Sequence, residues 1–258
     1  MIETLYEVVQ EAGRRILTYF EHPISVVHKA DASPLTEADR ASHTWLVERL
    51  TALFPDIPVL SEESPPETYT ERFTWRRFWL IDPLDGTKEF IKRTGEFTVN
   101  VALIEDRVPV AGIVYVPVMG RAYVAERGKG AFRLDDEHMY PIRTRPAGDT
   151  VRVVASKDHQ GPLVCQVLER IPGAEIKHMG SSLKFCLVAE GEADLYIRDT
   201  PTMEWDTAAA QCVVEVAGGQ VLTLEGEPLQ YNKPELKNPP LVTIGDPGLP
   251  WQKWLATP

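Results

Sequence analysis

The nine residues WLIDPLDGT at 79–87 constrain the fold more than any other part of the chain. The apolar residues that precede Asp82 predict a buried strand. Pro83 has no backbone N–H and cannot continue a strand ladder, so the chain must turn there. This turn can aim Asp82, the Leu84 carbonyl and Asp85 at one point. Oxygen ligands of this kind suit Mg²⁺, which prefers carboxylates, carbonyls and water.

The two residues after this turn predict an anion site. Gly86 and Thr87 begin a short helical turn, and the N–H groups at the start of a helix bind anions. A metal site and a phosphate cradle would then be adjacent in the sequence. The structural alternative is an Asx-type turn that only joins a strand to a helix. We favour the metal site because a buried strand delivers both acids and a Gly-Thr pair follows them.

Three further acids are candidate metal ligands. Glu62 and Glu63 follow a short apolar run at 59–60, and taken alone they fit a solvated loop equally well. Asp206 lies at the predicted N-cap of a helix over 207–217, and capping is a sufficient structural role for it. The carboxylates of the 79–87 stretch make Glu62 and Glu63 candidate ligands, whereas a ligand role for Asp206 depends on the resemblance described below.

Hydrophobic periodicity predicts helices and an antiparallel sheet in the first half, and alternating strands and helices in the second. The first-half helices are expected at 2–20 and 36–54, and its strands at 59–60, 78–81, 97–104, 108–116 and 121–126. The second-half strands are expected at 151–155, 175–178, 193–197, 220–224 and 241–244, with helices at 160–170, 181–190 and 207–217. A polar, turn-rich stretch at 135–149 separates them, so we divide the chain into halves at 1–135 and 136–258.

Charge and cysteine content narrow the function. Lysine and arginine number 27 against 38 acidic residues, a formal charge of −11 that argues against binding a nucleic acid polymer. A small anionic substrate remains compatible, because divalent cations reverse the field of an acidic pocket. The three cysteines form no Cys-x-x-Cys pair and suit a reducing compartment, so we expect a cytoplasmic protein. We expect no secretion signal and no integral membrane segment, and the sequence leaves peripheral membrane association open.

Several motifs resemble those of the inositol monophosphatase superfamily. They are Ser61–Ser64 (SEES), Ile81–Thr87 (IDPLDGT), Trp205–Asp206 and Ala217–Gly219. Within this family the bacterial 3'(2'),5'-bisphosphate nucleotidase branch is the most similar, on the stretches Lys29–Asp39, Gly86–Ala102 and Gly180–Tyr196. The resemblance implies an α+β or α/β layered sandwich (αβαβα) of two intimately packed halves, a monomer or homodimer, with lithium sensitivity and a role in sulfur metabolism.

The resemblance also implies roles for individual residues. One metal would be bound by Glu62, Asp82 and the Leu84 carbonyl, a second by Asp82, Asp85 and Asp206, and a third, looser one near Glu62 and Glu63. This gives two to three Mg²⁺ per site. Asp39 and Thr87, or Glu62, would prepare the attacking water. The substrate would contact Glu62, Leu84, Asp85, Gly86, Thr87 and Asp206.

The substrate implied by the branch is adenosine 3',5'-bisphosphate, cleaved to AMP and phosphate. Lys29, Ser181, Lys184 and Arg198 are candidate contacts of the second phosphate, and an ordinary solvated surface position is an equal alternative for each. Asp199 lies where inositol-phosphate enzymes hold a sugar hydroxyl. An inositol-1-phosphate or sugar phosphatase therefore remains as one alternative. A second alternative is a non-catalytic nucleotide-binding regulator.

The spacing of the acids argues against an aspartyl-phosphate enzyme. Hydrolases of the haloacid dehalogenase type have one residue between the two aspartates of their Asp-x-Asp motif. Here Pro83 and Leu84 separate Asp82 from Asp85. We therefore expect direct hydrolysis without a covalent phosphoenzyme.

Overall fold

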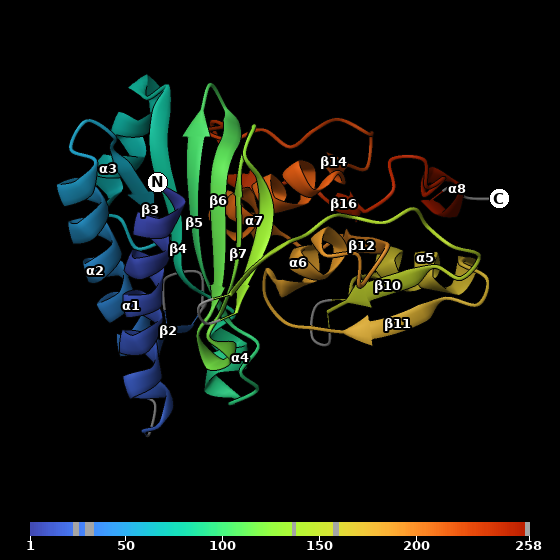
Figure 1. Cartoon of the computed structure of the whole chain (residues 1–258), viewed down its shortest axis with the longest axis horizontal. Coiled ribbons are helices and arrows are strands. Elements are labelled where there is room, and N and C mark those ends of the chain that lie inside the picture. Colours follow the sequence, from blue (N-terminus) through green and yellow to red (C-terminus); the bar gives the residue numbers. More distant parts are fainter. Residues whose placement is uncertain (23–25, 29–33, 136–137, 157–159, 256–258) are drawn as a thin grey trace.

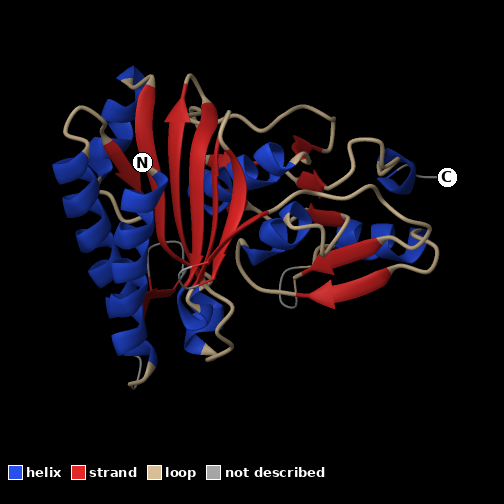
Figure 2. Cartoon of the chain, viewed as in Figure 1, coloured by secondary structure: helices blue, strands red, loops and turns tan. Residues whose placement is uncertain are grey.

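The computed structural model describes residues 1–22, 26–28, 34–135, 138–156 and 160–255. They form five layers in the order helix, sheet, helix, sheet, helix (Figures 1 and 2). This arrangement confirms the αβαβα sandwich that the sequence predicted. No helix in the described part of the chain combines the length and the apolar character needed to cross a bilayer.

The first layer consists of the two long N-terminal helices, α1 (Ile2–Phe20) and α2 (Glu37–Leu53). The apolar residues of α1 recur at three- and four-residue steps and pack into one hydrophobic cluster with the neighbouring sheet. Helix α2 begins at a capping box, in which Thr36 and Asp39 bond reciprocally. This places the Asp39 carboxylate at the start of α2.

The second layer is a seven-stranded sheet in the order β3-β4-β5-β6-β7-β8-β9. Its strands are β3 (Val59–Ser61), β4 (Arg77–Asp85), β5 (Thr98–Glu105), β6 (Val108–Val116), β7 (Arg121–Glu126), β8 (Gly130–Asp135) and β9 (His138–Pro141). Strand β3 runs parallel to β4, and the other neighbours are antiparallel. In β4, Trp79 and Ile81 face the first helical layer while Phe78 and Leu80 face the middle one, so both faces of this strand are buried.

Strands β8 and β9 correct the predicted secondary structure. The predicted turn at 127–130 is confirmed between β7 and β8, but the sequence indicated no strand at 130–135 and predicted a turn-rich segment from residue 135. The sheet instead continues to Pro141, past the point at which we divided the chain. All four residues of β9 are exposed, so this edge strand lacks the apolar pattern by which a strand is recognised.

The middle layer consists of α6 (Leu183–Ala189) and α7 (Glu204–Ala217), with one sheet on each side. Helix α7 lies so close to β6 that a Cβ atom at Gly112 would be 2.4 Å from the Ala209 carbonyl oxygen. The helix begins three residues earlier than predicted. Asp206 is its third residue rather than its N-cap, and its carboxylate accepts the Met203 N–H at 2.8 Å.

The fourth layer is a five-stranded sheet in the order β11-β10-β12-β16-β14. Its strands are β10 (Arg152–Ala155), β11 (Glu175–His178), β12 (Leu195–Arg198), β14 (Gln220–Thr223) and β16 (Leu241–Ile244). The last layer consists of α5 (Pro162–Arg170) and α8 (Gln252–Leu255). The predicted closing strand, β16, lies inside the sheet between β12 and β14.

Short elements complete the described chain. They are β1 (Val26–His28), β2 (Pro34–Thr36), α3 (Pro66–Glu71), η1 (Arg72–Thr74), α4 (Thr87–Ile91), η2 (Pro117–Met119), β13 (Thr202–Met203) and β15 (Lys237–Asn238). Two of them contribute to the site directly. Helix α4 follows the Asp-Gly-Thr turn, and β13 leads into α7.

Candidate metal centre and active site

Three carboxylates from both halves of the chain meet between the layers. Asp82 and Asp85 end strand β4, where the pairing with β5 shifts register between them. Asp206 comes from the first turn of α7. One carboxylate oxygen from each lies within 4.8 Å of the other two. The sequence predicted that the strand ends in a turn at Pro83, but β4 continues through Pro83 to Asp85 with this shift in register. The irregularity brings two acids of one strand close to a third from a distant helix.

Burial, together with the repulsion of neighbouring acids, raises the pKa of two members of this group. Burial raises the pKa of Asp82 well above its usual value, and the nearby charges of Glu62, Asp85 and Asp206 raise it further. Burial, followed by the charges of Asp85 and Glu62, raises the pKa of Asp206 to about 8. A cluster of hard oxygen donors whose charges repel one another fits a divalent cation, which would neutralise them.

Residues that the sequence analysis did not single out hold Asp85 in place. Its Oδ2 atom accepts the Ser182 N–H at 2.6 Å and lies 2.5 Å from the Ser182 hydroxyl. Thr98 and Asn100 donate to the same oxygen at 3.4 and 3.5 Å. The sequence did contain a signal for this contact, because Thr98 and Asn100 are polar residues at alternate positions of the otherwise apolar, buried strand β5. All four contacts involve the Oδ2 atom, so they hold the Asp85 carboxylate in one orientation.

Glu62 and Glu63 follow β3 but differ in position. Glu62 lines the same cavity as the three aspartates, although it lies outside the group in which all ligand atoms are within 4.8 Å. Its carbonyl accepts the Tyr69 hydroxyl at 2.9 Å. Glu63 is not among the cavity-lining residues. Its charge acts on the neighbouring His43 instead: burial lowers the pKa of His43, and the Glu63 charge partly opposes this by raising it.

Asp39 and Thr87 lie next to each other. The Thr87 hydroxyl donates to Asp39 Oδ1 at 3.4 Å and lies 3.4 Å from the Leu84 carbonyl oxygen. The other oxygen of Asp39 accepts the Thr36 N–H at 2.8 Å, which fixes the carboxylate. Gly86 has φ of +93°, and a Cβ atom there would lie 3.2 Å from the Glu96 carbonyl oxygen. Glycine is therefore required in this turn.

The carboxylates form one wall of an open cavity of about 240 Å³. Ser181, Lys184 and Arg198 line it together with Tyr196 and Phe185. Lys184 is only 2% exposed, which removes the solvated-surface alternative for this residue. Its ammonium group donates to the Ser181 carbonyl at 2.6 Å. Burial and, to a smaller extent, Arg198 lower its pKa to about 8. Lys29 lies outside the described residues.

The Asp199 carboxylate is engaged with helix α5, contrary to the expectation that it faces the substrate. Its carboxylate accepts the N–H groups of Gly161, Leu163 and Val164, at 3.0, 2.9 and 3.4 Å. It thus caps α5, and it is absent from the residues that line the cavity. The reason is that the first N–H groups of a helix need acceptors, and α5 begins with Gly-Pro, which provides none.

Comparison with known proteins agrees with this geometry. The model of the inositol monophosphatase family matches residues 1–244. The chain is 46% identical to the 3'(2'),5'-bisphosphate nucleotidase CysQ of Escherichia coli, over 91% of this chain and 95% of that protein. It is 40% identical to the enzyme of that name from Aggregatibacter actinomycetemcomitans, over 98% and 96%. The crystal structure of CysQ from Bacteroides thetaiotaomicron superposes with a TM-score of 0.82 at 41% identity, covering 94% and 97%.

Proposed function

The chain belongs to the inositol monophosphatase family, and we infer that it is a 3'(2'),5'-bisphosphate nucleotidase, a phosphoric monoester hydrolase. The observation that carries this inference is the cluster of Asp82, Asp85 and Asp206 at the wall of a cavity, in a chain 40–46% identical to enzymes of that name. The substrate we propose is adenosine 3',5'-bisphosphate. Its products are AMP and inorganic phosphate.

We propose Mg²⁺ as the cofactor, with two to three ions per site. The ligands would be Asp82, Asp85, Asp206, Glu62 and the Leu84 carbonyl, with Glu63 near the loosest ion. All are hard oxygen donors, as Mg²⁺ requires. The chemistry that bound divalent cations supply at such a site is generation of the nucleophile and stabilisation of the leaving oxygen.

The protein's own residues prepare and orient the reacting groups. The hydroxyl of Thr87, fixed by Asp39, would orient a water molecule toward phosphorus, with Glu62 as the alternative base. The N–H groups of Gly86 and Thr87 would hold the phosphate oxygens. The water oxygen forms a bond to phosphorus, the bond from phosphorus to the ribose 3'-oxygen breaks, and that oxygen takes up a proton.

Three further residues of the same cavity would bind the second phosphate. Ser181, Lys184 and Arg198 line the cavity, and two of them are cationic. Acids for the metals and cations for a remaining phosphate line the same cavity, and this combination suits a bisphosphate better than a polyol phosphate. The engagement of Asp199 with α5 removes the acid that we expected for a sugar hydroxyl.

A cytoplasmic location is consistent with the thiols. Cys165, Cys186 and Cys212 are all described, and none of them forms a disulfide. We propose the cytoplasm because such thiols persist in reducing compartments. Fractionation of cells that produce the protein would test this proposal.

The test of function is phosphate release from adenosine 3',5'-bisphosphate and from inositol 1-phosphate at matched concentrations, with Mg²⁺ and with a chelator. We expect the nucleotide to be hydrolysed faster, and only in the presence of Mg²⁺. Preference for inositol 1-phosphate would make the chain a polyol phosphatase. Absence of Mg²⁺-stimulated release from both substrates would favour the non-catalytic regulator.

A further inference from the structure

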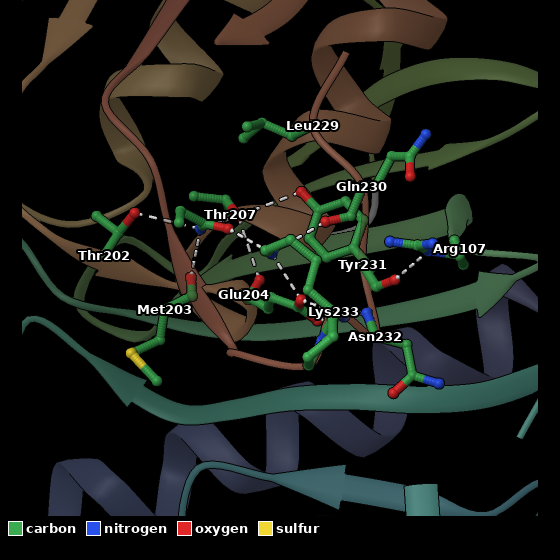
Figure 3. Close-up of polar contacts among 12 residues, drawn as sticks. Arg107, Thr202, Met203, Glu204, Thr207, Leu229, Gln230, Tyr231, Asn232 and Lys233 are labelled. Carbon is green, nitrogen blue, oxygen red and sulfur yellow. Dashed lines mark hydrogen bonds and ion pairs between the residues drawn. The ribbon is translucent and has the colours of Figure 1, made fainter. Parts of the chain in front are cut away.

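A group of buried polar residues lies next to the carboxylate cluster of Asp82, Asp85 and Asp206 and lines no part of the cavity. At its centre is Glu204, which has no exposed surface. Its carboxylate accepts the N–H groups of Asn232 and Lys233 at 2.6 and 2.9 Å, and the Lys233 ammonium group at 2.6 Å (Figure 3). Both oxygens of a fully buried carboxylate are therefore satisfied by one short segment from late in the chain.

The backbone of that segment is shaped to receive a carboxylate. Asn232 has φ of +58°, in the left-handed region that few residues other than glycine adopt. Successive N–H groups in such a turn point to the same side and form a site for an anion. Here the anion is the side chain of Glu204, so the strained turn is stabilised by the contact it makes.

Arg72 attaches the same segment to the first half of the chain. It is 3% exposed. Its guanidinium donates to Asn232 Oδ1 at 2.8 Å, to the Lys233 carbonyl at 2.7 Å and to the Pro234 carbonyl at 2.9 Å. Asn232 returns a bond to the Arg72 carbonyl at 2.9 Å. We call the four residues Arg72, Glu204, Asn232 and Lys233 the Glu204 clamp.

The two sides of the clamp lead directly to different metal ligands. Glu204 opens the helical turn that carries Asp206. Arg72 follows α3, whose Tyr69 donates to the Glu62 carbonyl at 2.9 Å. The rings of Tyr69 and Trp205 also meet edge to face, with centroids 6.2 Å apart. The segments that carry Glu62 and Asp206 are therefore connected through side chains that line no part of the cavity.

A second set of bonds from the same part of the chain restrains α7. Asn238 donates to the Met203 carbonyl at 2.8 Å and to the Thr207 hydroxyl at 3.0 Å. The Glu204 N–H donates to the Leu236 carbonyl at 2.9 Å. Residues on both sides of Asp206 are thus bonded to residues 230–238, and the first turn of α7 has little freedom to shift.

We propose that the Glu204 clamp fixes the separation of Glu62 and Asp206, so that both can bind the same pair of divalent cations. Arg72, Glu204 and Lys233 are then positioning residues, because they touch neither substrate nor ligand atoms. The inference rests on the proposed function. It predicts that loosening the clamp weakens cation binding first and turnover as a consequence.

The experiment compares Arg72→Gln and Lys233→Met with the wild type and with Arg145→Met as a matched control. Arg145 pairs with a fully buried acid, Asp194, at 2.9 Å, away from the ligand-bearing segments. Calorimetry with Mg²⁺ alone measures cation affinity on folded protein. Steady-state kinetics on adenosine 3',5'-bisphosphate at several Mg²⁺ concentrations measure kcat and KM separately.

The expected result is a loss of Mg²⁺ affinity of about tenfold or more in Arg72→Gln, which is the usual size for a residue that orients metal ligands. Excess Mg²⁺ should restore kcat, while KM for the nucleotide changes little. Lys233→Met should lose less, since its backbone N–H still bonds Glu204. Arg145→Met should lower thermal stability and leave Mg²⁺ affinity unchanged.

Wild-type Mg²⁺ affinity in folded Arg72→Gln would overturn the clamp. If Arg72→Gln does not fold, Lys233→Met decides by the same measurement. Equal loss of affinity in Arg145→Met would also overturn the proposal, because the effect would then follow from general destabilisation. A wild-type protein that binds Mg²⁺ but releases no phosphate would overturn the proposed function, while the calorimetry would still decide the clamp.

Discussion

The carboxylate cluster of Asp82, Asp85 and Asp206 and the Glu204 clamp are neighbouring groups of polar residues with opposite electrostatics. In the cluster, Asp82, Asp85 and Asp206 repel one another, and the pKa of Asp206 rises to about 8. In the clamp, the charge of Glu204 is balanced by Lys233 and by backbone N–H groups. A binding site for cations must keep negative charge without a protein partner until the cation binds. A structural contact that positions other residues must instead have its charges and hydrogen bonds paired within the protein. The two groups should therefore respond in opposite ways to substitution.

The largest effect is expected from Asp82→Asn. Loss of a ligand at the centre of the cluster should lower kcat at least roughly a hundredfold, the scale for a main electrostatic stabiliser. The metal-free protein should be no less stable, because a buried charge among like charges is removed while Asn can still accept the Leu84 N–H. Turnover assays and urea unfolding check both halves of the prediction. Turnover within a few-fold of the wild type would reject Asp82 as a ligand.

Glu204→Gln should lower stability clearly and turnover less, the reverse of what we expect for Asp82→Asn. Removing one partner of a buried, hydrogen-bonded charge pair costs about 3 kcal/mol, and Lys233 is 22% exposed in this pair, which places the loss at or below that figure. We expect a clear fall in the urea midpoint and a smaller fall in kcat, about tenfold at limiting Mg²⁺. A variant as stable as the wild type would remove the contrast between the two groups.

Lys184→Met should act mainly on substrate binding, although its charge also lies near Asp85. A charge-assisted bond to a phosphate contributes about 1.5–3 kcal/mol, so KM for adenosine 3',5'-bisphosphate should rise about tenfold or more. The KM for adenosine 3'-phosphate, which lacks the second phosphate, should change little. An equal change in KM for both substrates would place Lys184 outside the binding site of the second phosphate.

The last prediction concerns the pH dependence of stability. A carboxyl group whose pKa is higher in the folded than in the unfolded protein contributes stability below its unfolded value and loses it as pH rises through its folded value. For Asp206 this window runs from 3.8 to about 8. The Tm of the metal-free wild type should therefore decline toward pH 8, and Asp206→Asn should flatten the decline. Because Glu204→Gln keeps all three carboxylates of the cluster, it should keep the decline. A pH-independent Tm in the metal-free wild type would contradict the repulsion described above.

The cluster was accessible from the sequence because its signal is local. An apolar strand, Pro83 and two acids with a Gly-Thr pair are contiguous, and they imply a turn lined with carboxylates without knowledge of the fold. Asp206 needed the family resemblance, because a carboxylate in the first turn of a helix has a sufficient role as a cap. The layered fold followed from the alternation of helices and strands together with the same resemblance.

The clamp and the role of Asp199 were not accessible, because their partners are distant in sequence. Asn232, Lys233 and Pro234 resemble an ordinary surface turn, and Arg72 resembles a solvated cation. Only the fold brings Arg72 to Lys233. Asp199 was expected to face the substrate, and the first turn of α5 occupies its carboxylate instead. Long-range pairing decides such cases, and no local pattern encodes it.

Anomalous diffraction from a crystal soaked in Mn²⁺ tests the central claim most directly, since Mn²⁺ takes the same oxygen ligands as Mg²⁺ and its position can be identified. The predicted result is anomalous density between the carboxylates of Asp82, Asp85 and Asp206, with a second ion toward Glu62. Full occupancy elsewhere in the molecule, with no density among these carboxylates, would contradict the account.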